Sequence, residues 1–184
     1  MPSSLNNARE RMEKALDALR REFAGVRTGK ASPALLDTVR VEAYGSLMPV
    51  NQVGQVTAPE PRLLTVQPYD KSLIKAIERA LRESDLGLNP ANDGNLIRIP
   101  LPALTEERRK EYVKLLHRYA EEGRVAVRQA RQHANDDIKK RQKDGELSED
   151  EVRRAQDQVQ KLTDEYVHKV DDLLKKKEAE VLEV

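Results

Sequence analysis

The uneven distribution of prolines constrains the fold of this chain more than any other feature of its sequence. Eight of the nine prolines lie between Ala31 and Ala103, and none follows Pro102. Charge shows the opposite trend, because segment 31–103 carries 15 charged residues among 73, whereas segment 104–184 carries 39 among 81. Proline has no backbone N–H and breaks helices in their interior. The chain is therefore expected to combine two different architectures.

The composition excludes several classes of protein. The 184 residues include no cysteine, which excludes a disulfide framework, cysteine-ligated metal sites and a thiol nucleophile. Apolar runs are only a few residues long, far short of the ~20 that a membrane helix needs, and the start lacks the apolar core of a signal peptide. We therefore expect no membrane association and a cytoplasmic location. With a net charge of +1, any nucleic-acid binding must come from a local patch.

The first 30 residues show the pattern of an amphipathic helix. Ser3 or Ser4 is a candidate cap at its start, Gly29 is a candidate residue just past its end, and Pro33 prevents continuation. Its apolar residues recur at steps of three and four and share one face: Leu5, Ala8, Met12, Leu16, Leu19, Phe23 and Val26. Such a helix needs partners to bury this face.

Two further helical patterns follow residue 104. Thr105 is a candidate N-cap for the first of them, Asp144-Gly145 interrupts it, and Ser148 with Glu151 forms a capping box before the second. The apolar faces are Tyr112, Leu116, Tyr119, Val127, Ala130, Ala134 and Ile138, and then Val152, Ala155, Val159, Leu162, Tyr166, Val170 and Leu173. We predict that the three helices pack into an elongated three-helix bundle.

The middle segment changes to the period of two that strands show. Asp70 is a candidate cap for one short helix that carries Leu73, Ile74, Ile77 and Leu81. Strand candidates lie at residues 39–43, 47–50, 53–57, 64–66 and 96–99. The prediction is an α+β chain in which residues 1–30 and 104–184 form the bundle and residues 31–103 form a small inserted β-rich α/β domain.

An inserted domain is joined to its host by two segments of chain. Both of these segments contain proline, which favours a hinge with limited directions of travel. The predicted hinge residues are Lys30, Ala31, Ser32, Pro33, Pro100, Leu101, Pro102, Ala103, Leu104 and Thr105.

A search for catalytic chemistry finds no convergent site. The three histidines, His117, His133 and His168, lack metal-ligand spacing, and no glycine-rich phosphate-binding loop occurs. Adjacent carboxylates such as Asp136-Asp137 point about 100° apart on a helix and cannot share one substrate atom. We expect no catalytic residues, no cofactor and no metal, and hence no enzyme.

Three arginines form the strongest candidate binding site. Arg124, Arg128 and Arg131 fall within about 60° of one another on the second long helix, beside its apolar face. Glu121 is the acidic residue within reach on the same helix. One interpretation is that the arginines cover the edge of the core or pair with carboxylates. The other is an edge that binds RNA phosphates, because the planar arginine fork suits phosphate oxygens.

Five segments, in this order along the chain, resemble the ribosome recycling factors of bacteria and organelles. They are residues 26–36 (VRTGKASPALL), 84–90 (SDLGLNP), 100–110 (PLPALTEERRK), 125–128 (VAVR) and 160–164 (QKLTD). The resemblance implies an L-shaped monomer whose bundle lies on the rRNA of the large ribosomal subunit. It also implies action with GTP-bound elongation factor G to split the post-termination ribosome into subunits.

The resemblance also implies rRNA-binding residues. Arg128 and Arg131 match basic contact positions, and Arg27 and Lys30 lie in the first hinge motif. Arg124 is added from its place on the helix alone. The sequence departs from the family pattern where Lys30 replaces arginine, where Ala43 replaces tyrosine, and where Gln132 replaces a further basic residue. The alternative from another class is a coiled-coil interaction protein whose inserted domain docks a protein partner.

Overall fold

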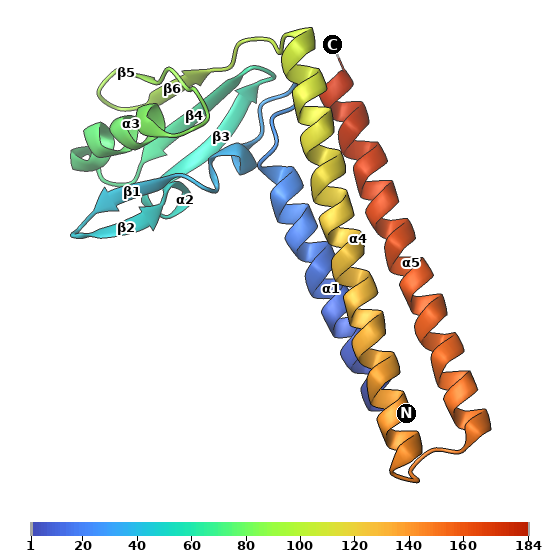
Figure 1. The fold of residues 1–184 in the computed structure, drawn as a ribbon. Helices are drawn as coiled ribbons and strands as arrows, with labels where there is room; N and C mark the ends of the chain where they lie inside the picture. The colour runs from blue at the N-terminus through green and yellow to red at the C-terminus, as the bar shows by residue number, and fades with distance from the viewer. Residues whose placement is uncertain (1, 184) are drawn as a thin grey trace. The chain divides into compact units, whose positions relative to one another are not determined.

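The computed structural model describes residues 2–183 and contains three long helices that run side by side (Figure 1). They are α1 (Pro2–Ala24), α4 (Glu106–Lys143) and α5 (Glu149–Leu182). Contacts fix their directions: Ser4 of α1 reaches Asp137 near the end of α4, whereas Leu19 lies against Gly123 nearer its middle. α1 and α4 are therefore antiparallel. The three-helix bundle is confirmed. No helix in the described part of the chain is both long and apolar enough to cross a membrane.

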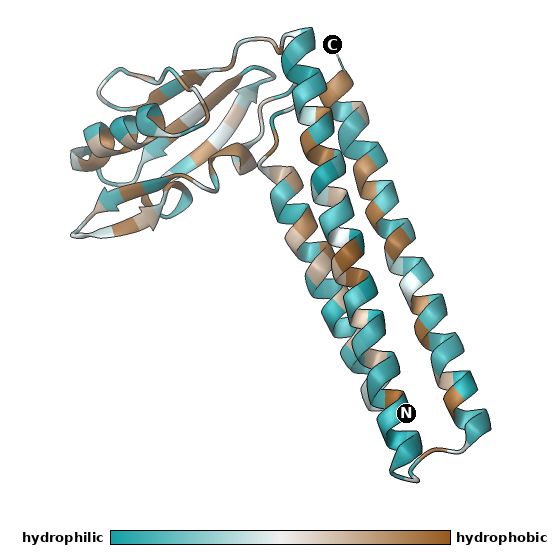
Figure 2. Cartoon of the chain, viewed as in Figure 1, coloured by the Kyte–Doolittle hydropathy of each residue, from teal (hydrophilic) through white to brown (hydrophobic). Residues whose placement is uncertain are grey.

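The bundle core is built from the predicted apolar faces. Met12 and Leu16 of α1, Leu116 and Val127 of α4, and Val170 of α5 are completely buried. Hydrophobic residues recur along all three helices, with hydrophilic residues between them (Figure 2). Burying a side chain of this size contributes about 1.5–3 kcal/mol, so the shared core outweighs helix propensity as the source of the bundle's stability.

The predicted faces need several corrections. On α4, Tyr112 and Tyr119 are only half-buried, whereas Ala120 and Gly123, which the prediction left out, are buried. Leu174, not Leu173, is buried near the end of α5, and Leu5 is only half-buried. One residue corresponds to about 100° of rotation on a helix, so a step of four from Val170 is needed where a step of three was expected.

Most helix ends follow the predicted caps. The Thr105 hydroxyl accepts the N–H of Arg108 at 3.1 Å. The Ser148 hydroxyl accepts the N–H of Glu151 at 3.2 Å, and the Glu151 carboxylate accepts the N–H of Ser148 at 2.7 Å. This reciprocal pair is the predicted capping box.

The prediction for the ends of the first helix was wrong. α1 begins at Pro2, so Ser3 and Ser4 lie inside it. Their hydroxyls bond α4 instead: Arg141 donates to Ser3 at 2.7 Å, and Ser4 donates to Asp137. α1 also ends at Ala24, well before Gly29.

The second compact unit contains two antiparallel sheets (Figure 1). The first is a hairpin of β1 (Arg40–Ala43) and β2 (Ser46–Pro49). The second has the order β3-β4-β6-β5, with β3 (Gly54–Glu60), β4 (Leu63–Pro68), β5 (Ala91–Asn92) and β6 (Ile97–Pro100). The helical elements are η1 (Pro33–Leu36), α2 (Val50–Val53), η2 (Lys71–Leu73) and α3 (Ile74–Glu83). The sequence prediction lacked η1, α2 and β5.

The core of this unit is shared by the sheets and α3. Leu64 of β4, Ile97 and Ile99 of β6, and Ile77 and Leu81 of α3 are completely buried. Asp70 caps η2, which leads directly into α3: its carboxylate accepts the N–H of Ser72 at 2.9 Å. α3 itself starts without a side-chain cap. α+β is therefore the observed fold class.

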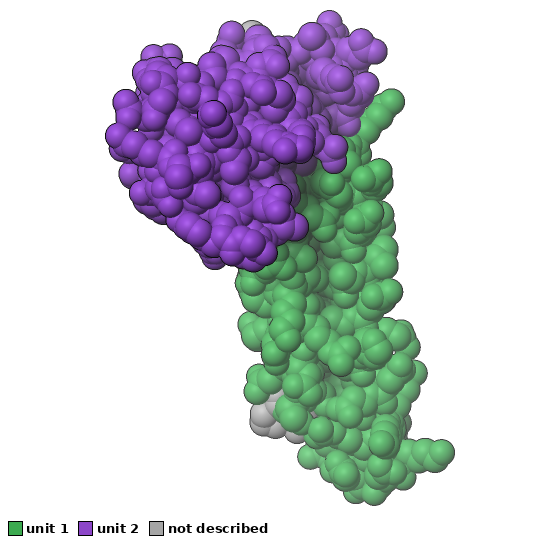
Figure 3. Space-filling model, turned by 90° about the vertical axis from the view of Figure 1, so that its left-hand side faces the viewer, with its two compact units in different colours: residues 1–23, 113–178 green, residues 24–112, 179–184 purple. Residues whose placement is uncertain are grey.

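Contacts divide the chain into two compact units (Figure 3). One comprises residues 1–23 and 113–178, and the other comprises residues 24–112 and 179–184. The contact-based division assigns the start of α4 and the end of α5 to the unit that contains the sheets, whereas domain boundaries concern independent folding and movement. The boundaries drawn from the sequence remain a prediction.

Gly123 in the middle of α4 offers a test of the bundle packing. A Cβ atom at this position would lie 3.4 Å from Leu19 Cδ2, which is ordinary van der Waals contact. Glycine in a helix interior costs about 0.5–1 kcal/mol relative to alanine. We expect Gly123→Ala to raise the free energy of unfolding by about this amount in urea titrations, and the half-buried Ala126→Gly to lower it similarly. Destabilisation by Gly123→Ala would show that α1 and α4 leave no room for a methyl group.

Tyr166 of α5 predicts how the bundle responds to alkaline pH. Burial raises its pKa to about 12, and its hydrogen bond to Glu13 of α1, at 2.5 Å, acts in the same direction. The unfolded chain releases this proton near pH 10, so the folded state binds more protons between about pH 10 and 12. This contribution to stability is complete below pH 10 and is lost as pH rises to 12. Tyr166→Phe should remove that part of the pH dependence in denaturant titrations, and an unchanged pH profile would contradict it.

Candidate nucleic-acid interface

Helix α4 brings the three predicted arginines to the edge that it shares with α5. Arg124 bonds Asp171 and Arg131 bonds Gln160, and both partners belong to α5. The arginines lie at steps of four and three on α4, beside buried Val127 and Ala130. The edge is therefore a row of cations held by the same packing that buries the core. We call these three residues the arginine edge.

Arg124 is the most firmly held member of the arginine edge. Its Nε and Nη2 atoms donate to Asp171 Oδ1 at 2.9 and 2.6 Å, and its Nη1 donates to Glu121 Oε2 at 3.0 Å. Only 19% of its side chain is exposed. Burial by itself lowers the pKa of Arg124, but the hydrogen bonds to Asp171 and Glu121 outweigh it and the pKa is raised. All three nitrogens of this guanidinium are engaged.

Arg128 and Arg131 are less constrained. Arg128 is 48% exposed and donates from Nη1 to Glu121 Oε1 at 3.1 Å. Arg131 contacts the neutral Gln160 amide oxygen at 3.5 Å, at the limit of a hydrogen bond. No carboxylate forms an ion pair with Arg131 within residues 2–183. Pairing with carboxylates therefore decreases from Arg124 through Arg128 to Arg131, and Arg128 is the most exposed of the three.

The sequence reasoning missed Asp171. Helical spacing on α4 pointed to Glu121 as the acidic partner of Arg124, whereas Asp171 lies 47 residues from Arg124 on another helix. In the free protein, Arg124 therefore fits the first interpretation of the sequence, in which the arginines pair with carboxylates. The sequence did contain a signal for Asp171, because it follows Val170 of the predicted apolar face. A residue next to a buried position on a helix lies near the edge of the apolar face.

Arg27 and Lys30 belong to the compact unit that contains the sheets. The Arg27 guanidinium donates from Nη2 to the carbonyl of Pro102, so it links the two predicted hinge segments. Burial lowers the pKa of Arg27, and the neighbouring charge of Arg62 acts in the same direction. Lys30 is largely exposed and lies 3.7 Å from the Glu183 carboxylate.

Two of the predicted hinge residues are tied to the turn between β3 and β4. Ala31 donates its N–H to the carbonyl of Pro61 at 2.6 Å, and Leu101 donates to the adjacent Arg62 at 2.7 Å. Both chain segments are therefore fixed to the small sheet at one place.

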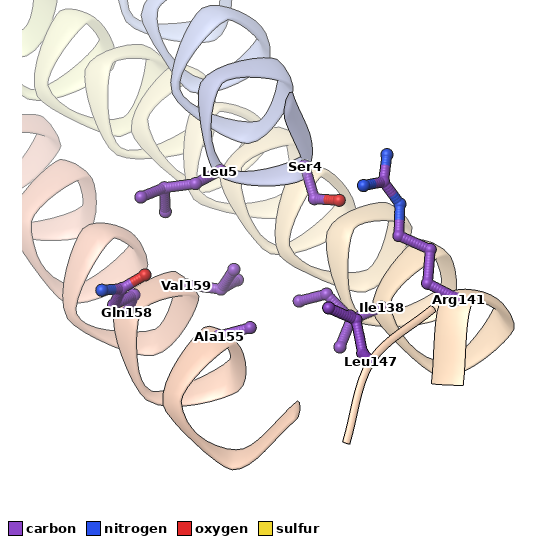
Figure 4. Close-up of a pocket in the computed structure, with 8 residues that line it drawn as sticks. All are labelled: Ser4, Leu5, Ile138, Arg141, Leu147, Ala155, Gln158 and Val159. Carbon is purple, nitrogen blue, oxygen red and sulfur yellow. The ribbon is translucent and has the colours of Figure 1, made fainter. Parts of the chain in front are cut away.

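One enclosed cavity in the bundle is small. It lies near the start of α1 and the connection between α4 and α5 (Figure 4), and its volume is about 10 Å³. Its lining residues are Ser4, Leu5, Ile138, Arg141, Leu147, Ala155, Gln158 and Val159. That volume is at the lower limit for one water molecule, so the cavity is packing space and not a ligand site. Within residues 2–183, no group of three or more histidine or acidic side chains is placed to hold a metal ion.

Comparison with known proteins assigns the family. A family model described as ribosome recycling factor matches residues 19–182. The ribosome-recycling factors of Rubrobacter xylanophilus and Bacillus subtilis are 56% and 55% identical over 180 residues, which cover 98% of this chain and 97% of each relative. This chain belongs to the ribosome recycling factor family.

Solved structures agree with the sequence comparison. The solution structure of a ribosome recycling factor matches with a TM-score of 0.79 at 43% identity and covers 99% of this chain and 97% of its own. A second match, with a TM-score of 0.69 at 51% identity and 98% coverage of both chains, describes models of the T. thermophilus ribosome recycling factor and the E. coli elongation factor G bound to the E. coli post-termination complex.

Proposed function

We propose that this protein binds the post-termination ribosome and, with elongation factor G and GTP, splits it into subunits. The observation that carries the proposal is family membership over residues 19–182. A structural relative described together with elongation factor G on the post-termination complex supports the choice of partner. In this proposal the protein works in the cytoplasm as a monomer and is not an enzyme, because the partner binds and hydrolyses GTP.

The bundle serves as the anchor in this mechanism. Arg124, Arg128 and Arg131 bind phosphates of large-subunit rRNA, with Arg27 and Lys30 as further contacts. Phosphate contacts fix the position of a protein on nucleic acid without reading its sequence. Such anchoring suits a factor that must find one place on the ribosome.

The small domain serves as the moving part. It pivots about residues 30–33 and 100–105 and transmits force from elongation factor G to the contacts between subunits. The bonds of Ala31 to Pro61 and of Leu101 to Arg62 support this, because they tie the ends of both hinge segments to the domain that moves. Movement of either hinge segment is then passed directly to the sheet.

Arg131 provides the clearest test of the anchor, since no carboxylate competes for it in the described structure. We expect Arg131→Ala to weaken binding to large ribosomal subunits roughly fivefold or more and to reduce the log–log salt slope by about 0.7–0.9, with unchanged helical circular dichroism. Arg118→Ala is the matched control, because Arg118 lies about 140° from Arg131 on α4, pairs with Glu122 at 3.9 Å and also carries one positive charge. Equal losses of affinity in the two variants would show that the net charge of the protein, and not the position of Arg131, controls binding.

Light scattering of post-termination ribosomes tests the whole function. We expect scattering to fall only when the protein, elongation factor G from a matched source and GTP are all present. A Pro100→Ala/Pro102→Ala variant should keep its ribosome affinity but split ribosomes more slowly, because its hinge is less constrained. Pro59→Ala, at an exposed position of β3, controls for loss of a proline elsewhere in the same domain.

The outcomes separate the hypotheses. A fall in scattering without elongation factor G or GTP would contradict the proposal that the partner factor and its GTP drive the splitting. Equal loss of binding and splitting in the double-proline variant would contradict the hinge. Salt-insensitive binding to a protein partner, with no binding to large subunits, would favour the coiled-coil interaction protein.

A further inference from the structure

Glu121 occupies one guanidinium nitrogen of Arg124 and one of Arg128, where a phosphate oxygen could also bind. Its Oε1 atom accepts from Arg128 Nη1 at 3.1 Å, and its Oε2 atom accepts from Arg124 Nη1 at 3.0 Å. One carboxylate thus bridges two of the three arginines on the edge. A phosphate group presents the same geometry of two oxygens with shared negative charge, so carboxylate and phosphate compete for the same N–H groups.

The two carboxylates around Arg124 differ in how firmly they are placed. Asp171 binds Nε and Nη2 with one oxygen and connects α5 to α4, so it orients the guanidinium from the side of the bundle. Glu121 is 55% exposed and lies on the same helix as both arginines. Its side chain can rotate into solvent without disturbing the packing of α4 on α5, and an exposed ion pair of this kind is weak.

Glu121 is ionised when the protein meets its ligand. The hydrogen bonds from Arg124 and then Arg128 lower the pKa of its carboxyl group below the ordinary value. At neutral pH the Glu121 carboxylate therefore compensates part of the positive charge of the arginine edge.

We propose that Glu121 is a built-in competitor of rRNA, and that a phosphate group replaces its carboxylate at Arg124 and Arg128 when the protein binds. Asp171 stays on Arg124 and keeps its guanidinium in place for the phosphate. The inference rests on the proposed function, since it concerns the same arginine edge. Its consequence is weaker binding and faster release than three uncompensated arginines would give, which suits a factor that must leave the ribosome after each cycle.

Glu121→Gln tests the competition, because it keeps the size of the side chain and removes its charge. We expect it to bind large ribosomal subunits about three- to tenfold more tightly than the unaltered protein in sedimentation assays. Glu122→Gln is the matched control: Glu122 is the next residue, is 60% exposed and pairs with Arg118 away from the arginine edge. It makes the same change in net charge and should change affinity much less.

A double-mutant cycle identifies the arginines involved. In an Arg128→Gln background, Glu121→Gln should gain clearly less affinity than it does in the unaltered protein, because one of the two competing contacts is already gone. A gain of equal size in both backgrounds, or an equal gain for Glu121→Gln and Glu122→Gln, would overturn the inference while leaving ribosome binding intact. Failure of the unaltered protein to bind large subunits in a salt-dependent manner would instead overturn the proposed function.

Discussion

The structure depends on burying three apolar helix faces against one another. None of the three long helices can bury its own face, and α1 comes from the opposite end of the sequence to α4 and α5. Met12 and Leu16 of α1 are buried in the same core as Val127 of α4 and Val170 of α5, so the chain between α1 and α4 leaves this core and returns to it. The two connecting segments, and the opportunity to insert a separate α+β unit, follow from this constraint.

The same packing decides the electrostatics of the bundle surface. α4 places Arg124, Arg128 and Arg131 along one edge, and α5 supplies Asp171 to hold the first of them. Charge compensation consequently decreases along the edge, from Arg124 with two carboxylates to Arg131 with none in the described residues. A near-neutral chain thus presents a locally graded cationic surface without a large net charge.

The parts of the fold that could be read from sequence are those that local chemistry controls. Thr105 and the pair Ser148 and Glu151 cap helices through neighbouring backbone N–H groups, and the apolar steps of three and four gave the bundle faces to within one residue. The two-residue strand β5 was missed because it is too short to show alternation. Ser4 was misread as a cap because its bond to Asp137 of α4 has no local signature.

For the candidate site, the sequence alone determined that three arginines share an edge of one helix, because helical geometry relates residues three and four positions apart. It also determined the family, through five motifs spread along the chain. Only the tertiary structure decided which arginines pair with carboxylates and which does not. Asp171 reaches Arg124 across 47 positions, and such a contact depends on the rotation and alignment of α5 against α4, which packing of the whole core sets.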